Sequence, residues 1–298
     1  MITSGGGRPE PGVRLGVEHD HDRKPFFVSF ASFVVRIRQE KNLRISIASY
    51  SFHGLLAEGR MNAFTYLEAI KYRYRLNAAD FWNGTIGSTD EAYVRKVRQT
   101  MDEEEIVCAN YHVDGVHVWD PRPEVREQNY RNALIHLRLA ELLGARTVRI
   151  DFGGRESAMS NEQFDTIVNR FREYAIFAGD HGFKIGPETH FGPALVPENM
   201  KRVWQAVNHP AYGILLHIRH WVPGKVDEGD RMAAPWAIHT HIDQATTREC
   251  LEEKIRLLLD AGYQGYWGVE HHSAKNEYAE VACQVAEVQK ILARLGAK

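Results

Sequence analysis

Short apolar runs alternate with longer amphipathic segments along most of the chain, from Arg44 to the C-terminus. Each short run is followed by a turn, which is the pattern of a buried strand that leads into a helix. Eight strands are predicted on this basis: Arg44–Tyr50, Asn77–Trp82, Ile106–His112, Arg146–Asp151, Phe183–Glu188, Tyr212–His217, Trp236–His241 and Gly265–Glu270. The repeated strand–helix order predicts a parallel sheet covered by helices.

The segments between the predicted strands carry apolar residues at helical spacing. In Glu124–Leu143, the residues Leu137, Ala140 and Leu143 fall on one face, and Gly144 follows as a helix stop. Further helices are predicted from Asn161 to about Gly182, over Arg248–Ala261 and over Glu277–Leu295. Together with the strands, they make an α/β protein of eight strand–helix units.

Two architectures are compatible with this order, a (β/α)8 TIM barrel and an open, doubly wound sheet. A barrel takes about 250 residues, which is the length available in residues 44–298. A doubly wound sheet usually has a glycine-rich phosphate loop after its first strand. The segment Ser51-Phe52-His53-Gly54 follows that strand here and has no such motif. We therefore expect residues 44–298 to form a TIM barrel.

Residues 1–43 differ from the rest and are interpreted as an N-terminal extension that is partly disordered. Ser4–Gly12 is rich in glycine and proline, whereas Phe26–Val35 is apolar. The apolar segment lies too far from Met1, and lacks the small residues, to be a signal peptide. It is a candidate for an oligomer contact, or alternatively for an element packed on its own barrel. Glu18–Asp22 is interpreted as a polar tail rather than a metal site.

Composition narrows the classes of function. The 298 residues are 44% hydrophobic and 26% charged, which is typical of a folded soluble protein. The net charge of −2 offers no electrostatic footprint for nucleic acid, and no apolar run reaches the length of a membrane span. Cys108, Cys250 and Cys283 are too few and too far apart for a disulfide framework, which favours the cytoplasm.

Metal-capable side chains end four consecutive predicted strands. Glu188 ends the fifth strand, His217 the sixth, His241 the seventh and Glu270 the eighth. In a barrel these ends meet at the C-terminal face, where active sites form. Two carboxylates and two imidazoles suit Mn, Fe, Co or Zn better than Ca or Mg, and Mn is the metal we expect. His239 points the same way as His241 but lies deeper in the strand, so His241 is the preferred ligand. For His217, the alternative is that it does not bind the metal and that the other three residues do.

These motifs resemble the sugar phosphate isomerase/epimerase superfamily, the xylose-isomerase-like TIM barrels, over residues 44–298. Glu188-Thr189-His190 matches the Glu-x-His segment that ends strand five in the family, and Glu270 matches the glutamate that ends strand eight. His241-Ile242-Asp243 matches the strand-seven segment approximately. His217-x-x-His220 stands where the family has Asp-x-x-His, so a histidine replaces the usual aspartate.

The resemblance implies a metal-dependent isomerase or epimerase of a sugar, keto-sugar or inositol derivative. In the family, one glutamate removes the proton next to a carbonyl and the other returns a proton to the enediolate. The resemblance assigns these roles to Glu188 and Glu270 in this chain. The resemblance also implies that His220 contacts the substrate, and that His190 contacts the substrate or orients Glu188. The alternative is a lyase or dehydratase acting on an oxidised sugar or glycoside with the same metal site.

The other strand ends supply further candidates for substrate binding. His53, Trp82 and His112 are expected to line the pocket, and His112 has the additional role of a base in lyase-type relatives. Phe52, Trp119 and Trp221 are candidates for stacking walls, with the alternative that they pack in the core. Two other functions are less consistent with the sequence. An AP endonuclease would need further metal ligands and a basic surface, which the sequence lacks. A non-catalytic barrel would not need the four strand-end residues, which are all present. A homo-oligomer is expected, with a small second subunit as a further possibility implied by the family.

Overall fold

The computed structural model describes residues 43–297, and all eight predicted strands are present in it. The strands are β1 (Ile45–Ala48), β2 (Ala78–Trp82), β3 (Val107–Val113), β4 (Thr147–Ile150), β5 (Lys184–Gly186), β6 (Ile214–His217), β7 (Ala237–Ile242) and β8 (Trp267–Val269). Each observed strand begins and ends within two residues of its predicted bounds. The apolar runs were therefore sufficient to locate every strand.

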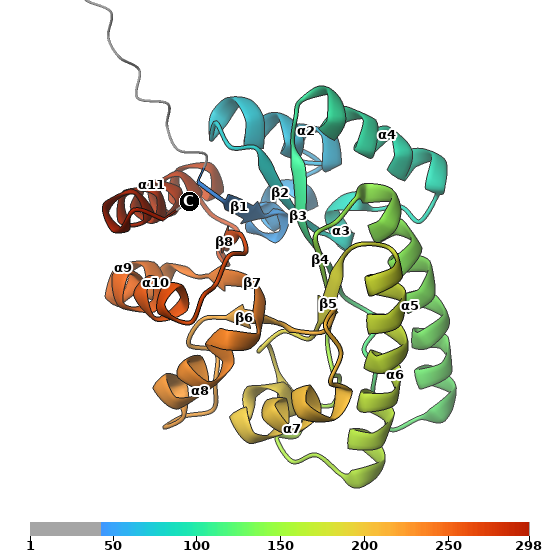
Figure 1. Cartoon of the computed structure of the whole chain (residues 1–298). Helices are drawn as coiled ribbons and strands as arrows, with labels where there is room; N and C mark the ends of the chain where they lie inside the picture. The colour runs from blue at the N-terminus through green and yellow to red at the C-terminus, as the bar shows by residue number, and fades with distance from the viewer. Residues whose placement is uncertain (1–42, 298) are drawn as a thin grey trace, which may run out of the picture. The chain divides into compact units, whose positions relative to one another are not determined.

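The strands form one parallel sheet that closes into a barrel. Its order is β5-β4-β3-β2-β1-β8-β7-β6, so every strand except β5 and β6 has two hydrogen-bonded neighbours. Isolated bridges join Ile185 to Tyr212 and Glu188 to Leu215, and these bring β5 against β6. The helices form a ring around the strands (Figure 1). The predicted TIM barrel is confirmed, and the open sheet is excluded.

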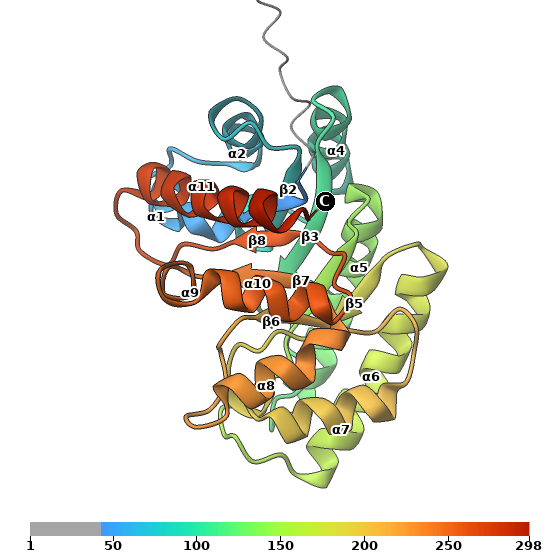
Figure 2. The same cartoon turned by 60° about the vertical axis from the view of Figure 1, so that its left-hand side comes forward.

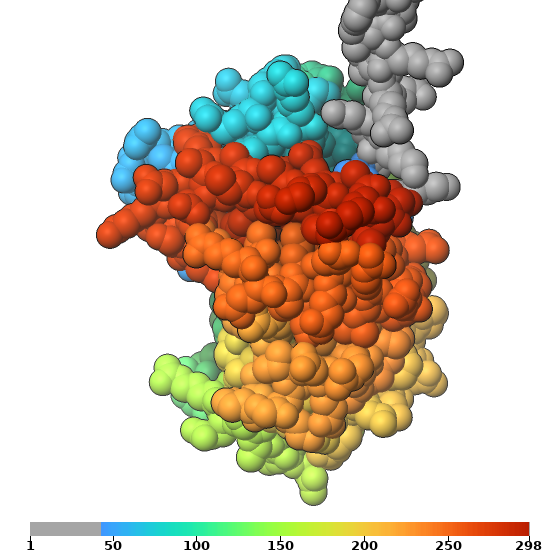
Figure 3. Space-filling view, turned by 90° about the vertical axis from the view of Figure 1, so that its left-hand side faces the viewer, coloured from blue at the N-terminus to red at the C-terminus, as the bar shows by residue number. Residues whose placement is uncertain are grey.

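Helices connect successive strands and cover the outside of the barrel. They are α1 (His53–Ala57), α2 (Ala63–Glu68), α3 (Asn83–Ile86), α4 (Glu91–Glu103), α5 (Pro123–Leu143), α6 (Asn161–Asp180), α7 (Pro197–Val207), α8 (Val226–Ala233), α9 (Gln244–Glu249), α10 (Leu251–Asp260) and α11 (Glu277–Leu295). Single turns of 3-10 helix span Ser49–Phe52, Gly192–Leu195 and Ala234–Trp236, and a π turn spans Ala69–Arg73. Helices α10 and α11 lie side by side on one face (Figures 2 and 3).

Local sequence signals explain where the long helices begin and end. Pro123 begins α5, and Gly144 ends it in the left-handed conformation with φ of 63°. Ser160 caps α6 by accepting a hydrogen bond from the backbone of Gln163. The predicted single helix over Arg248–Ala261 is wrong, because Cys250 has non-helical backbone angles, with φ of −152° and ψ of 23°, and separates α9 from α10.

The barrel interior contains a row of buried polar side chains on neighbouring strands. Alternate residues of β2, β3 and β4 point inwards, and they include Asp80, Asn110 and Thr147, all of which are buried. The Asn110 side chain donates to Asp80 and accepts from Thr147, at 2.8 and 2.9 Å. The aliphatic core lies instead between the strands and the helices, with Ile45, Val148 and Ile185 among its members. Charged groups in the barrel therefore have polar neighbours.

The predicted extension lies outside the described residues, apart from Leu43 itself. Its boundary, and the interpretations of Glu18–Asp22 and Phe26–Val35, stay predictions. Within residues 43–297, no helix is both long and apolar enough to cross a membrane.

Candidate metal centre

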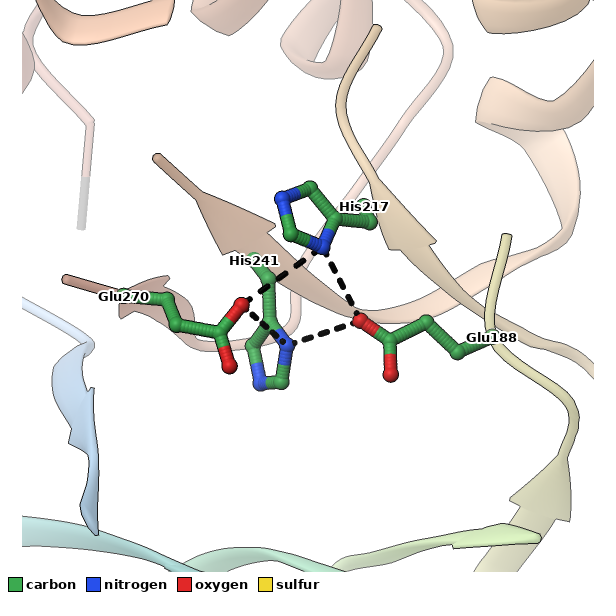
Figure 4. Close-up of side chains that lie close together, drawn as sticks. All are labelled: Glu188, His217, His241 and Glu270. Atoms are coloured by element: carbon green, nitrogen blue, oxygen red, sulfur yellow. Dashed lines mark hydrogen bonds and ion pairs between the residues drawn. The ribbon is translucent and has the colours of Figure 1, made fainter. Parts of the chain in front are cut away.

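The barrel brings the four predicted metal ligands together at its C-terminal end. His217 ends β6 and pairs in register with His241 of β7, while Glu270 directly follows β8 and Glu188 lies two residues beyond β5. All four residues are buried, and their ligand atoms lie within 4.8 Å of one another. Figure 4 shows the two imidazoles between the two carboxylates.

The distances within this cluster fit a single small cation. Nδ1 of His217 lies 3.1 Å from Oε1 of Glu188 and 3.5 Å from Oε2 of Glu270. Nδ1 of His241 lies 3.0 and 3.3 Å from the same two oxygens. Ligands about 2.1 Å from one ion lie at most about 4.2 Å apart, so these separations are those of one coordination sphere. Two nitrogens and two carboxylates are a donor set suited to Mn, Fe, Co or Zn.

A buried aspartate on β2 orients one of the imidazoles. Oδ2 of Asp80 lies 3.1 Å from Nε2 of His241 and 2.6 Å from Nε2 of His239. An Nε2–H of His241 that donates to Asp80 leaves the lone pair of Nδ1 facing the cluster. Burial would raise the pKa of Asp80, but His239 and His241 hold it well below its usual range. His239 lies deeper than the cluster, as predicted, whereas the sequence analysis did not find Asp80.

An arginine on β4 orients one of the carboxylates. The buried Arg149 places Nε 3.0 Å from Oε2 of Glu188. Its Nη1 donates to Asp114 at 2.6 Å and to Asp151 at 3.1 Å. Burial would raise the pKa of the Glu188 carboxyl, but Arg149 and His241 lower it well below its usual range. Arg149 was also missed as a site residue.

The second carboxylate has a histidine partner instead. Nε2 of His272 lies 3.0 Å from Oε2 of Glu270, and the His272 side chain is 45% exposed. Burial would raise the pKa of the Glu270 carboxyl, but His241 and His272 hold it well below its usual range. His272 was not among the predicted site residues, although it follows Glu270 by two positions at a strand end.

Two predicted substrate-binding histidines lie directly beside the cluster. His220 stacks on His217 with ring centroids 3.9 Å apart, because the chain turns back at Arg219, which has a φ of 71°. His190 lies 3.1 Å from Oδ2 of Asp151 and 4.0 Å from Oε2 of Glu188. Burial would lower the pKa of His190, but its hydrogen bond to Asp151 raises it to about 9. Both rings border the cluster, as expected.

His112 is buried next to the cluster without any hydrogen-bond partner among residues 43–297. Its ring centroid lies 5.3 Å from that of His241, and both of its ring nitrogens are unpaired. Burial lowers the pKa of His112 to about 4, so the ring is neutral at pH 7. Buried polar atoms are normally satisfied, so two unpaired nitrogens beside a metal cluster indicate a place for a ligand.

His53 and Trp82 lie at the rim, around Tyr50. His53 stacks on Tyr50 with centroids 4.6 Å apart, and Trp82 meets the same ring edge-on at 5.3 Å. The Trp82 indole donates to Asp114 at 2.9 Å. These contacts build an aromatic wall on the β1 and β2 side of the site.

The three other aromatic candidates divide between cleft and core. Trp119 lines a cleft of about 730 Å³, a size suited to a small organic molecule. The cleft lies between the loops that follow β3, β4 and β5, and its other walls include His117, Arg155 and Phe191. Phe52 and Trp221 are buried, so they are core residues and the stacking role is wrong for them. Phe52 packs among tyrosines, and the Trp221 indole donates to Asp230 at 2.8 Å.

Comparison with known proteins identifies relatives of this architecture. The sequence family described as xylose isomerase-like TIM barrel matches residues 64–294. No curated protein matches the chain.

Several solved structures share the fold at low sequence identity. A xylose isomerase-like TIM barrel protein from Mycobacterium smegmatis in complex with magnesium has a TM-score of 0.68 and 16% identity, covering 86% of this chain and 98% of that one. A probable 3-DHS dehydratase from Bacillus anthracis has a TM-score of 0.64 and 16% identity, covering 82% and 98%. D-psicose 3-epimerase from Clostridium cellulolyticum H10, solved with D-tagatose, has a TM-score of 0.64 and 12% identity, covering 85% and 98%.

Proposed function

Because the chain belongs to the xylose isomerase-like TIM barrels, we propose that it is a divalent-metal-dependent isomerase or epimerase of a sugar, keto-sugar or inositol derivative. The observation that carries this proposal is the buried cluster of Glu188, His217, His241 and Glu270 at the C-terminal ends of four consecutive strands. Such a set of N and O donors, at the face where barrel enzymes bind substrate, is what metal-assisted proton transfer next to a carbonyl requires.

In this proposal the four residues hold one Mn ion, with Fe, Co and Zn as alternatives. The ion would polarise the substrate carbonyl and stabilise the negative charge that develops on its oxygen. Replacement of the family's aspartate by His217 gives a protein ligand charge of −2 and a softer donor set, which disfavours Mg. The buried carboxylates of Glu188 and Glu270 belong to the cluster, and either of them is a candidate for the proton-transfer group next to the substrate carbon.

The chain's other residues bind and orient the substrate. His220 and His190 border the cluster on the β6 and β5 sides and can donate hydrogen bonds to substrate hydroxyl groups. The unpaired nitrogens of His112 face the same region. Tyr50 and Trp82, whose rings meet edge-on, supply aromatic surface of the kind that packs against a sugar ring.

A second candidate is a lyase or dehydratase acting on an oxidised sugar or glycoside. The observation that favours it is the neutral, unpartnered His112 beside the cluster, which provides a further proton acceptor for an elimination. Both reactions begin with loss of a proton next to a carbonyl. They differ in the product, because the lyase expels a leaving group whereas the isomerase keeps every atom.

The first experiment measures metal content by elemental mass spectrometry for the wild type, Glu270→Gln and the control Glu287→Gln on the surface of α11. We expect about one Mn, Fe, Co or Zn per chain in the wild type and the control, and much less in Glu270→Gln. The metal-loaded wild type is then incubated with D-fructose, D-tagatose and D-psicose in D2O, and proton exchange and products are followed by NMR. A wild type that holds no metal after reloading with Mn would overturn the proposal.

The remaining expectations of partner and location stay predictions. We expect a small carbohydrate as the substrate and a location in the cytoplasm. We also expect a homo-oligomer, with a small second subunit as a further possibility.

A further inference from the structure

The two carboxylates of the metal cluster differ on the side that faces away from the imidazoles (Figure 4). Oε1 of Glu188 faces Nδ1 of both histidines, and its Oε2 lies 3.0 Å from Nε of Arg149. The arginine is itself fixed, because its Nη1 is bound by Asp114 and Asp151 at 2.6 and 3.1 Å. Both oxygens of Glu188 therefore lie next to a partner: Oε1 faces the cluster, and Oε2 forms an ion pair, without a hydrogen bond, with the buried Arg149.

Glu270 keeps one oxygen open. Its Oε2 faces the cluster and also His272, whose Nε2 lies 3.0 Å away. Its Oε1 accepts no hydrogen bond from the side chains or backbone of residues 43–297, whereas the printed ion pairs of Glu270 run through Oε2. Within that part of the chain, no arginine or lysine forms an ion pair with Glu270. Glu270 therefore has no counterpart of the Arg149 clamp, the ion pair that Arg149 makes with Glu188.

We propose that Arg149 makes the two carboxylates unequal: Glu188 is a fixed metal ligand that binds through Oε1 alone, and Glu270 carries the proton. A proton carrier must bring an oxygen within hydrogen-bond reach of the substrate C–H group. The guanidinium of Arg149 covers Oε2 of Glu188 and holds it away from the substrate. Oε1 of Glu270 has no such cover. Arg149 is thus a positioning residue, which acts on the reaction through Glu188.

This assignment, which rests on the proposed function, selects one of its reactions. The Glu270 carboxylate takes the proton from the carbon next to the carbonyl, and the C–H electron pair becomes the C=C bond of an enediolate. The same carboxylic acid returns the proton to the former carbonyl carbon, and the hydroxyl proton of the carbon that lost its hydrogen moves to the former carbonyl oxygen. One carbon is thereby oxidised to the new carbonyl, its neighbour is reduced to the alcohol, and no outside oxidant is needed. Removal and return occur on one face of the substrate. That outcome is aldose–ketose isomerisation, whereas epimerisation returns the proton to the opposite face.

The clamp is tested first, with Co²⁺ alone as the probe. The visible spectrum of bound Co²⁺ reports its coordination number. In Arg149→Met, Glu188 is free to bind through both oxygens, so we expect the absorption maxima to shift and the intensity to fall relative to the wild type. Arg256→Met, a surface arginine on α10 that pairs with Glu252, is the control and should leave the spectrum unchanged. Arg149→Lys, which keeps the charge but lacks Nε, should reproduce the shift if Arg149→Met does not fold.

Identical Co²⁺ spectra in the wild type and in the folded Arg149 variant would overturn the clamp. The proton carrier is tested with Glu188→Gln and Glu270→Gln, both saturated with Co²⁺, using the sugar that exchanges fastest in the wild type. We expect Glu270→Gln to lose about 100-fold or more of its exchange rate with D2O, and Glu188→Gln to lose about 10-fold or less. Equal losses in two Co²⁺-loaded variants would overturn the assignment. If no sugar exchanges in the wild type, the carrier assignment falls with the proposed function, whereas the Co²⁺ spectra still decide the clamp.

Discussion

Oδ2 of Asp80 lies 3.1 Å from Nε2 of His241, so a strand on one side of the barrel orients an imidazole of the candidate metal cluster on another strand. The same carboxylate oxygen lies 2.6 Å from Nε2 of His239. Asp80 is fully buried, and its other oxygen accepts a hydrogen bond from Asn110. A carboxylate in this position fixes which nitrogen of the imidazole is free to bind a metal.

Asp80→Asn should therefore weaken metal binding. The Asn side chain keeps the size of Asp80 but removes the charge that holds the His241 proton on Nε2, and changes of this kind lower metal affinity by about 10- to 100-fold. Competition with a chromophoric chelator measures the affinity. Asp102→Asn, at an exposed carboxylate of α4, is the matched control. Equal affinities in wild type and Asp80→Asn would show that His241 is oriented without Asp80.

Metal binding should stabilise the folded protein. The four ligands are brought together only by the barrel, so the folded state binds the ion and the unfolded chain lacks the site. At a free metal concentration of about 100 Kd, the free energy of unfolding should rise by about 2.7 kcal/mol. For a protein of this size, Tm rises by about 2–4 °C per kcal/mol. Thermal unfolding with Mn²⁺ and with a chelator measures the shift, which should be much smaller in His217→Ala. An equal shift in that variant would place the ion elsewhere.

The metal-free protein should lose stability in acid partly because of His112. Burial lowers the pKa of His112 to about 4 in the folded protein, against about 6.5 when unfolded. Between these values the unfolded chain binds the extra proton, so stability falls as the pH falls from about 6.5 to about 4. The shift corresponds to about 3 kcal/mol.

Urea unfolding of the wild type and His112→Gln at pH 7 and pH 4.5 measures this contribution. The variant should lose less stability over the interval. His181→Gln, at the C-terminal end of α6, is the control and should follow the wild type. A His112→Gln curve that runs parallel to the wild type would contradict the prediction.

Gly268 on β8 should not tolerate a side chain. A Cβ at this position would lie 2.9 Å from Nε2 of His239 and 3.1 Å from Oδ2 of Asp80. Gly268→Ala should therefore reduce the free energy of unfolding by about 1–3 kcal/mol and weaken metal binding through Asp80. Chemical denaturation and chelator competition measure the two effects. Gly179→Ala in α6, where the nearest atoms would lie at 3.4 and 3.5 Å, should leave metal binding unchanged. Unaltered metal binding in Gly268→Ala would mean that Asp80 and His239 make room for the methyl group without moving His241.

The strand-end residues could be predicted because two local rules place them. Apolar runs locate each strand, and a period of two decides which residues share a face. Glu188, His217, His241 and Glu270 then fall at the same end of consecutive strands, and barrel closure brings them together. His190 and His220 were expected at the site from the family resemblance, and each lies within three residues of a strand-end residue of the cluster.

Asp80 and Arg149 escaped prediction for a different reason. Each occupies the middle of a short strand, where an isolated charged residue has no local pattern to mark its role. Asp80 meets His241 across 161 positions of sequence, and Arg149 meets Glu188 across the β4–β5 connection. The break at Cys250 was missed because it lies near the start of the predicted helix, and the apolar residues that define the helical spacing, Leu251, Ile255 and Leu258, all follow it.

The sequence by itself determined the order of the strands and helices, the closed parallel barrel and the four residues that meet at its C-terminal end. These features follow from hydrophobic periodicity and from the fixed geometry of parallel strands, both of which are local. The tertiary structure alone decided which buried charges hold those four residues in place. Arg149 clamps one carboxylate and leaves the other open, because side chains from distant strands share the barrel interior and their distances depend on how the whole sheet closes.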